Sequence, residues 1–203
     1  MGNLKILLLG MGALMLLTAP LQSQSVLKIG DKAPQTTQEV LDTSGRTLTL
    51  KSMFGANGLL VVFSCNTCPW VTKWEDRYNV LSSLAQANKI GMIALNPNER
   101  IRDRGESMDD MKKRAQKQEY SFPYALDKDH IIADAFGATR TPEVFLFDKN
   151  MTLVYHGAID DNADDAGAVE ADYAVNAINA MISGNDITQK ETKSLGCTIK
   201  RTE

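Results

Sequence analysis

The chain has 203 residues, of which 43% are hydrophobic, and it carries a formal charge of -3 with a pI near 5.5. This length and apolar fraction are typical of one globular domain with a sizeable core. The acidic balance and the absence of a Lys/Arg cluster argue against binding to nucleic acid or another polyanion.

Residues 1–25 have the pattern of a secretory signal peptide. Lys5 precedes an apolar stretch over residues 6–17, which is too short to span a bilayer comfortably, and small polar residues suited to cleavage follow it. We therefore predict an exported, periplasmic protein whose mature domain covers residues 26–203, with no membrane span after cleavage. An uncleaved membrane tether is the alternative.

The first strands are predicted at residues 47–50 and 59–64, and the second of these is apolar without polar alternation, as in a buried strand. Cys65 and Cys68 follow this strand directly, and a segment with helical periodicity comes after them. Two cysteines separated by two residues at the start of a helix can close a small disulfide ring, and the helix N-terminus favours the thiolate. The expected chemistry is disulfide exchange, in a compartment that is itself oxidising.

Half of a zinc site is another interpretation of this cysteine spacing, and a purely structural disulfide is a third. Zinc needs about four ligands, but only Cys197, His130 and His156 remain, without ligand spacing. We therefore expect no metal and no cofactor.

The segment after the cysteines predicts a helix over residues 69–87, with Pro69 in its first turn. Trp74 lies on its apolar stripe, and Glu75 is expected to face away from the core. A buried strand, an exposed helix and a short helix are expected next, at residues 90–95, 108–118 and 131–136. Such a strand-helix-strand series is typical of parallel strands buried on both faces.

The pattern then changes to an antiparallel hairpin. Residues 144–147 and 153–155 are apolar and flank a turn-forming cluster, and a last helix is predicted over residues 168–183. The predicted fold class is α/β, with a mixed central β-sheet and helices on both faces.

This order of elements, with Cys-x-x-Cys-Pro after the first buried strand and Thr141-Pro142 before the hairpin, resembles the thioredoxin fold. The resemblance implies that Pro142 is a cis-proline beside the dithiol, whereas an ordinary proline at a strand start is the alternative. The family's buried acid would fall at Leu59, and this departure leaves the redox direction open.

Within that fold the chain is similar to the exported peroxiredoxin-like (AhpC/TSA-like) redoxins. The likeness rests on the segments 65–69, 138–142 and 196–200, and it extends over about residues 28–201. The P-x-x-x-T-x-x-C loop of peroxiredoxins does not fit in either register. Counting back from Cys68 gives Cys65 and Val61 at the threonine and proline positions, and counting back from Cys65 gives Val62 and Gly58.

The resemblance implies a thiol-disulfide oxidoreductase that exchanges disulfides with a substrate protein and a redox partner protein. Cys65, expected to be exposed, would attack as a thiolate, and Cys68 would resolve the mixed disulfide. The backbone of Thr141 would be free to pair with an extended partner chain. The remaining residues expected to shape the site are Asn66, Thr67, Pro69 and Pro142.

Several residues keep more than one interpretation. Cys197, left over if Cys65 and Cys68 pair, is a buried small residue, an intermolecular bond or a third thiol that folds back over the site. Arg140 lies near the site or is a loop arginine, and Trp70 belongs to its apolar rim or to the core.

Two other functions are compatible with the motif. One is a thiol peroxidase, and the other is a Cu(I) carrier with His156 as third ligand beside the two thiolates. The two-residue spacing of the cysteines counts against the carrier.

Overall fold

The computed structural model describes residues 26–202. The signal peptide predicted at residues 1–25 lies outside the described residues. Within residues 26–202, no helix has the length and apolar character needed to cross a membrane.

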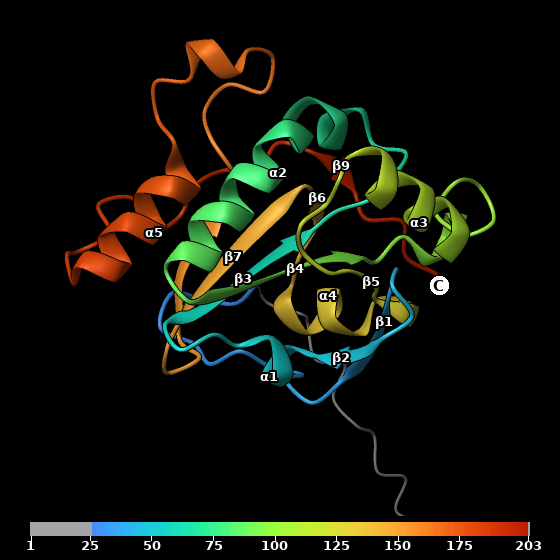
Figure 1. The fold of residues 1–203 in the computed structure, drawn as a ribbon, viewed down its shortest axis with the longest axis horizontal. Helices are drawn as coiled ribbons and strands as arrows, with labels where there is room; N and C mark the ends of the chain where they lie inside the picture. Colours follow the sequence, from blue (N-terminus) through green and yellow to red (C-terminus); the bar gives the residue numbers. More distant parts are fainter. Residues whose placement is uncertain (1–25, 203) are drawn as a thin grey trace, which may run out of the picture.

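A mixed sheet of seven strands forms the centre of the domain (Figure 1). One half has the order β2-β1-β5-β4 and the other the order β3-β7-β8. The two halves meet where β4 lies beside β3, and the Ser64 amide there donates to the carbonyl oxygen of Leu95 at 2.8 Å. The strands are β1 (Glu39–Asp42), β2 (Thr47–Thr49), β3 (Gly58–Phe63), β4 (Ile90–Asn96), β5 (Tyr124–Leu126), β7 (Glu143–Asp148) and β8 (Leu153–Gly157).

Helices cover both faces of this sheet (Figure 1). Helices α2 and α5 lie on one face, α1 and α4 lie on the other, and α3 packs beside β5. A separate pair of two-residue strands, β6 (Arg140–Thr141) and β9 (Cys197–Thr198), joins the C-terminal tail to the segment before β7. The helices are α1 (Leu50–Met53), α2 (Pro69–Ala87), α3 (Met108–Lys117), α4 (Ile131–Phe136) and α5 (Tyr173–Ser183), with short 3-10 turns η1 (Glu99–Ile101), η2 (Lys128–His130) and η3 (Ala166–Ala168).

The central strand β3 separates two cores because successive side chains point to opposite faces. Leu60 and Val62 face the core under α2 and α5, whereas Leu59, Val61 and Phe63 face the core under α1 and α4. Every residue of β3 is buried, which explains its unbroken apolar sequence.

Most predicted elements are present with small shifts in their ends. The helix predicted over residues 69–87 is α2, and the predicted hairpin is the antiparallel pair β7 and β8. The last helix begins at Tyr173 rather than at residue 168, because residues 166–168 form a 3-10 turn with Asp165 as its N-cap. The short strands β1 and β5 were not predicted, and neither were the two-residue strands β6 and β9.

Candidate active site

The two cysteines of the motif lie between the end of β3 and the start of α2. Cys68 is the N-cap of α2, with an extended backbone, and Pro69 occupies the first turn. Cys65 is 1% exposed and Cys68 is 3% exposed. The prediction of an exposed Cys65 is therefore wrong, because the C-terminal tail and the segment before β7 close over this loop.

Cys68 is disulfide-bonded to Cys197, and Cys65 is the free cysteine. This corrects the predicted pairing of Cys65 with Cys68, in which Cys197 was left over. The physical reason is the pairing of β9 with β6, which sets Cys197 opposite Thr141. The carbonyl oxygen of Thr141 lies 3.2 Å from the Cys68 sulfur, so this register brings the tail cysteine to the start of α2.

Thr141 contacts both motif cysteines. Its hydroxyl is 3.1 Å from the Cys65 sulfur, and its peptide bond to Pro142 is cis, as the thioredoxin resemblance implied. The Thr141 backbone was expected to be free for a partner chain, but β9 of the same chain already occupies this edge. The tail seats closely there because position 196 is glycine: a Cβ on Gly196 would lie 2.4 Å from the Thr141 carbonyl oxygen.

Contacts of Arg140 and Ile199 hold the tail around and after Cys197. Arg140 is exposed, and its guanidinium donates to the carbonyl oxygen of Gly196 at 3.4 Å and to the hydroxyl of Thr198 at 3.1 Å. Ile199 is buried, and its amide donates to the carbonyl oxygen of Thr139 at 3.1 Å. The side chain of Arg140 thus binds the tail strand that carries the cysteine.

The tail is also anchored before Cys197, along strand β8. The His156 amide donates to the carbonyl oxygen of Lys190 at 2.9 Å, and the Thr192 amide donates to that of His156 at 3.0 Å. Cys197 is therefore held between two bound segments.

A buried carboxylate lies beneath the loop between the two motif cysteines. Glu106 accepts the amide hydrogens of Asn66 and Thr67 at 2.8 and 2.9 Å, and the hydroxyl of Thr67 at 2.7 Å. The side-chain amide of Asn96 donates to it at 2.7 Å. Sequence reasoning missed Glu106, since a single acid in a polar loop carries no recognisable pattern.

A second buried carboxylate lies on α2. The Glu75 side chain was expected to face away from the core, but it is almost fully buried and accepts two bonds from Arg114, at 2.7 and 2.6 Å, and one from the Tyr120 hydroxyl. Arg114 also donates to the carbonyl oxygen of Asn66 at 2.9 Å. Charge pairing with α3 explains this burial, and it ties α3 to the cysteine loop.

Burial raises the pKa of the Cys65 thiol to about 12, and the negative charge of Glu106 acts in the same direction. The Thr141 hydroxyl, the Cys68 amide and the Arg114 charge oppose this rise only in part. The expected lowering of a thiol pKa by the helix N-terminus thus does not hold for Cys65, because desolvation is the larger effect. In this state Cys65 is a protonated thiol.

The two tryptophans after the motif differ in burial. Trp74 is buried in the core, and its indole N–H donates to Asp160 at 2.7 Å. Trp70 is partly buried, with its ring 5.9 Å from that of Trp74, and the Lys73 ammonium lies 5.1 Å from its centre. Trp70 thus packs at the edge of the core on α2.

His156 does not lie beside the cysteines as a third copper ligand, because its side chain contacts Glu143 and Phe145. Its Nε2 lies 2.7 Å from a carboxylate oxygen of Glu143, and its ring stacks on Phe145. Glu143 also accepts the amide hydrogens of Thr139 and Arg140. Among residues 26–202, no group of three or more His, Cys, Asp or Glu side chains is arranged to hold a metal ion.

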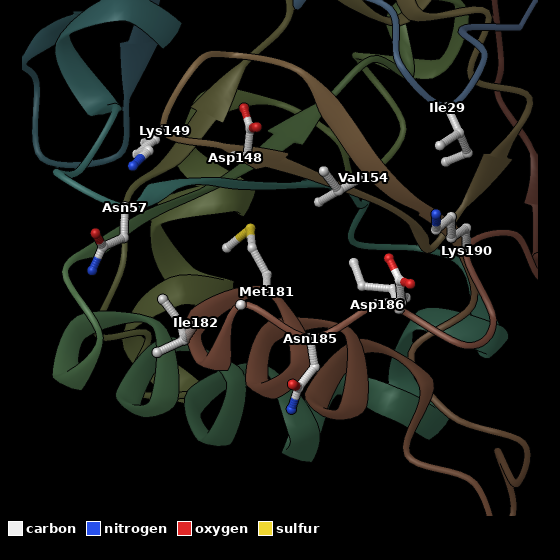
Figure 2. A pocket seen from close by; sticks show the side chains of 12 residues that line it. Ile29, Asn57, Asp148, Lys149, Val154, Met181, Ile182, Asn185, Asp186 and Lys190 are labelled. Atoms are coloured by element: carbon white, nitrogen blue, oxygen red, sulfur yellow. The ribbon is translucent and has the colours of Figure 1, made fainter.

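A cavity of about 500 Å³ lies apart from the sulfur cluster, between the end of α5 and the β7-β8 hairpin (Figure 2). Its walls combine apolar side chains such as Met181 and Val154 with charged ones such as Lys190 and Asp148. None of the three cysteines lines it, so this cavity is separate from the cysteine site.

Comparisons with known proteins bear on the family and the fold of the chain. The model of the AhpC/TSA family matches residues 29–156. Among curated proteins, none matches this sequence.

Solved structures extend the likeness over most of the chain. An uncharacterized conserved protein from Geobacillus kaustophilus has a TM-score of 0.80 at 26% identity, with 86% of this chain and 93% of that chain covered. A hypothetical protein from Sinorhizobium meliloti has a TM-score of 0.77 at 28% identity, with coverages of 88% and 97%. A thioredoxin-like protein solved in its oxidised form has a TM-score of 0.57 at 18% identity, with coverages of 77% and 97%. The predicted thioredoxin-like α/β fold is confirmed.

Proposed function

The chain belongs to the AhpC/TSA family, and we propose that it is a thiol-disulfide oxidoreductase in which Cys65, Cys68 and Cys197 share one disulfide and exchange it with a partner protein. One observation carries the proposal. Cys68 is bonded to Cys197 while Cys65 is free, and both motif sulfurs touch Thr141, Cys65 its hydroxyl at 3.1 Å and Cys68 its carbonyl oxygen at 3.2 Å. The free sulfur is thus adjacent to the bonded one.

The first step is an internal exchange. The Cys65 thiolate attacks the Cys68 sulfur, the Cys65–Cys68 bond forms, and the Cys68–Cys197 bond breaks. Cys197 leaves as a thiolate and takes up the proton that Cys65 lost. No net oxidation occurs, so the protein interconverts between two forms that each hold one disulfide.

Exchange with the partner starts from the Cys68–Cys197 form, which the reverse of the internal exchange restores, and Cys197 is the accessible sulfur of that form because it is only partly buried. A partner thiolate attacks Cys197, and Cys68 leaves as a thiolate at the N-terminus of α2, where the helix dipole stabilises it. A second partner thiol then resolves the mixed disulfide. The partner dithiol is oxidised to a disulfide, and the bond between Cys68 and Cys197 is reduced to two thiols.

A thiol peroxidase is the second candidate. The disulfide between Cys68 and Cys197, which lie 129 positions apart in the sequence, favours it because such a bond can join a peroxide-reacting thiol to a second thiol that resolves it. A peroxide would oxidise the Cys68 thiolate to a sulfenic acid and leave as an alcohol or water. Condensation with the Cys197 thiol would then release water and give the observed disulfide. The peroxiredoxin threonine and proline positions are Cys65 and Val61 here, and so the oxidoreductase remains the main proposal.

A glutathione redox titration with thiol trapping and mass spectrometry tests the main proposal. We expect the wild type to show both one-disulfide forms, Cys65→Ser only the Cys68–Cys197 form, and Cys197→Ser only the Cys65–Cys68 form. Failure to find a reversible disulfide among the three cysteines would overturn it. Peroxide consumption much faster than that of a free thiol, lost in Cys68→Ser, would favour the peroxidase instead.

The exported, periplasmic location is part of the proposal, and it rests on the signal-like pattern of residues 1–25. N-terminal sequencing of the protein from a periplasmic extract tests it. A mature chain that starts at Val26 is the expected result, and an intact Met1 in the cytoplasm would contradict it.

A further inference from the structure

The loop between Cys65 and Cys68 presents two successive amide hydrogens to one buried side chain. Both of these amides, from Asn66 and Thr67, donate to the Glu106 carboxylate. Backbone amides that follow a cysteine at a helix start are the groups that would otherwise stabilise its thiolate. For Cys65 this leaves the Cys68 amide and the Thr141 hydroxyl.

Charged and titratable groups reach Cys65 from four elements. Tyr78 of α2 and Tyr124 of β5 are neutral phenols, since burial raises the pKa of each far above its usual value. Arg114 of α3 is a cation, but it is paired with Glu75. Glu106, from the loop before α3, is therefore the anion beside Cys65 that has no cationic partner among its hydrogen bonds.

We propose that Glu106 is a positioning residue that holds Cys65 as a thiol, both by binding the two loop amides and by placing a negative charge beside the sulfur. This inference rests on the proposed function, because its consequence is a slow internal exchange. The bond between Cys68 and Cys197 then persists until a partner reaches Cys197. Glu106 acts through Cys65 and touches no reacting sulfur.

The internal exchange can be measured directly on the oxidised protein. Cys197 is released only when Cys65 attacks Cys68, so alkylation of Cys197 by a large excess of iodoacetamide, mapped by mass spectrometry, reports the exchange rate. In Glu106→Gln the Cys65 thiolate should be easier to form. For each unit by which the pKa of the Cys65 thiol falls, the thiolate fraction rises about tenfold and the nucleophilicity of the thiolate falls about threefold. The exchange rate should therefore increase roughly three- to fourfold.

The pH profile separates this effect from a loosened structure. Loss of the Glu106 charge should bring the plateau of the profile, which the wild type reaches near pH 12, to lower pH, whereas loosening would raise the rate at every pH and leave the plateau at the same pH. Glu106→Asp keeps the charge and should return the rate to within about twofold of the wild type. An unchanged profile in Glu106→Gln, or the same uniform increase in both variants, would refute the proposal.

Asp127 provides a matched control. It is another buried carboxylate that accepts two consecutive amide hydrogens, those of Ile132 and Ala133 in α4. Asp127→Asn should leave the exchange rate unchanged. If Cys197 is never alkylated in the wild type, or is alkylated equally fast in Cys65→Ser, the proposed function is wrong. If the wild type is alkylated through Cys65 but Glu106→Gln leaves the rate unchanged, only the role of Glu106 is wrong.

Amide hydrogen exchange decides the matter if Glu106→Gln does not fold. The carboxylate holds the Asn66 and Thr67 amides whatever the state of the disulfide, so both amides should remain protected at least about a hundredfold in the oxidised and the reduced wild type. Unprotected amides in either form would refute the proposal.

Discussion

Replacing Gly196 by alanine should make the Cys68–Cys197 disulfide easier to reduce. The new Cβ would lie 2.4 Å from the carbonyl oxygen of Thr141 and 3.2 Å from the nitrogen of Pro142. Both are backbone atoms of a buried segment, and so the tail must shift away from β6. The disulfide fixes residues 196 and 197 in this position, whereas in the reduced form this short stretch can shift between the anchors at Thr192 and Ile199.

The expected size follows from the cost of overpacking, which is about 1 to 3 kcal/mol for an added methyl group. This cost falls mainly on the oxidised form, because the disulfide at the next residue prevents Gly196 from moving away from Thr141. For a two-electron couple about 1.4 kcal/mol corresponds to 30 mV. Gly196→Ala should therefore raise the reduction potential by roughly 20 to 65 mV.

The assay is the glutathione titration, carried out with Cys65→Ser as the background so that only one disulfide can form. Gly167→Ala is the matched control, since its Cβ would meet only a flexible Asp165 side-chain oxygen at 3.2 Å. Its potential should equal that of the background. A Gly196→Ala potential equal to or below that of the control would refute the reasoning about the tail.

Three further predictions concern the charged groups. The internal exchange should become about tenfold faster per pH unit from pH 7 to 10, because the pKa of the Cys65 thiol is about 12. A plateau in the alkylation rate above pH 9 would instead indicate a thiol with an ordinary pKa. Arg114→Ala should lower the free energy of unfolding in urea by roughly 3 to 5 kcal/mol, because it leaves Glu75 buried without a cation, whereas the largely exposed Arg104→Ala should change it little. Burial raises the pKa of Asp127 to about 6, so the native state binds more protons than the unfolded state between about pH 4 and 6. The contribution of Asp127 to the free energy of unfolding should therefore fall by roughly 3 kcal/mol as the pH rises over that range. Asp127→Asn should remove this fall from urea titrations run at each pH.

The predictable parts of the fold are those with a strong local pattern. The unbroken apolar run that became β3 is buried on both faces, and α2 follows the helical spacing set by Trp74 and Tyr78. The same helix shows where local reasoning fails. Glu75 has the polarity of a surface residue, but Arg114 of α3 binds it in the interior, and no pattern within α2 indicates that partner.

The sulfur chemistry was predicted only in part for the same reason. Spacing identified Cys65 and Cys68 as a site, but the bond to Cys197 spans 129 positions and depends on the register of β9 against β6. Two residues per strand are too few to predict such a pairing. The glycine before Cys197 was noticed as part of a motif, and its physical role became clear only with the Thr141 backbone in place.

The anchoring of the tail decides how the three cysteines compete. The segment before Cys197 is bonded to His156 of β8, and the segment after it is held by Ile199 in the core and by the ion pair between Arg201 and Asp134 at 2.7 Å. These contacts do not involve sulfur, and they should therefore survive opening of the disulfide. After the internal exchange, the released Cys197 thiol therefore stays near the Cys65–Cys68 disulfide at a high effective concentration, so its return attack on Cys68 should outpace attack by most external thiols. Under the proposed exchange, a partner would therefore have to bind near Cys197, and its affinity for this tail surface should limit the rate of electron exchange.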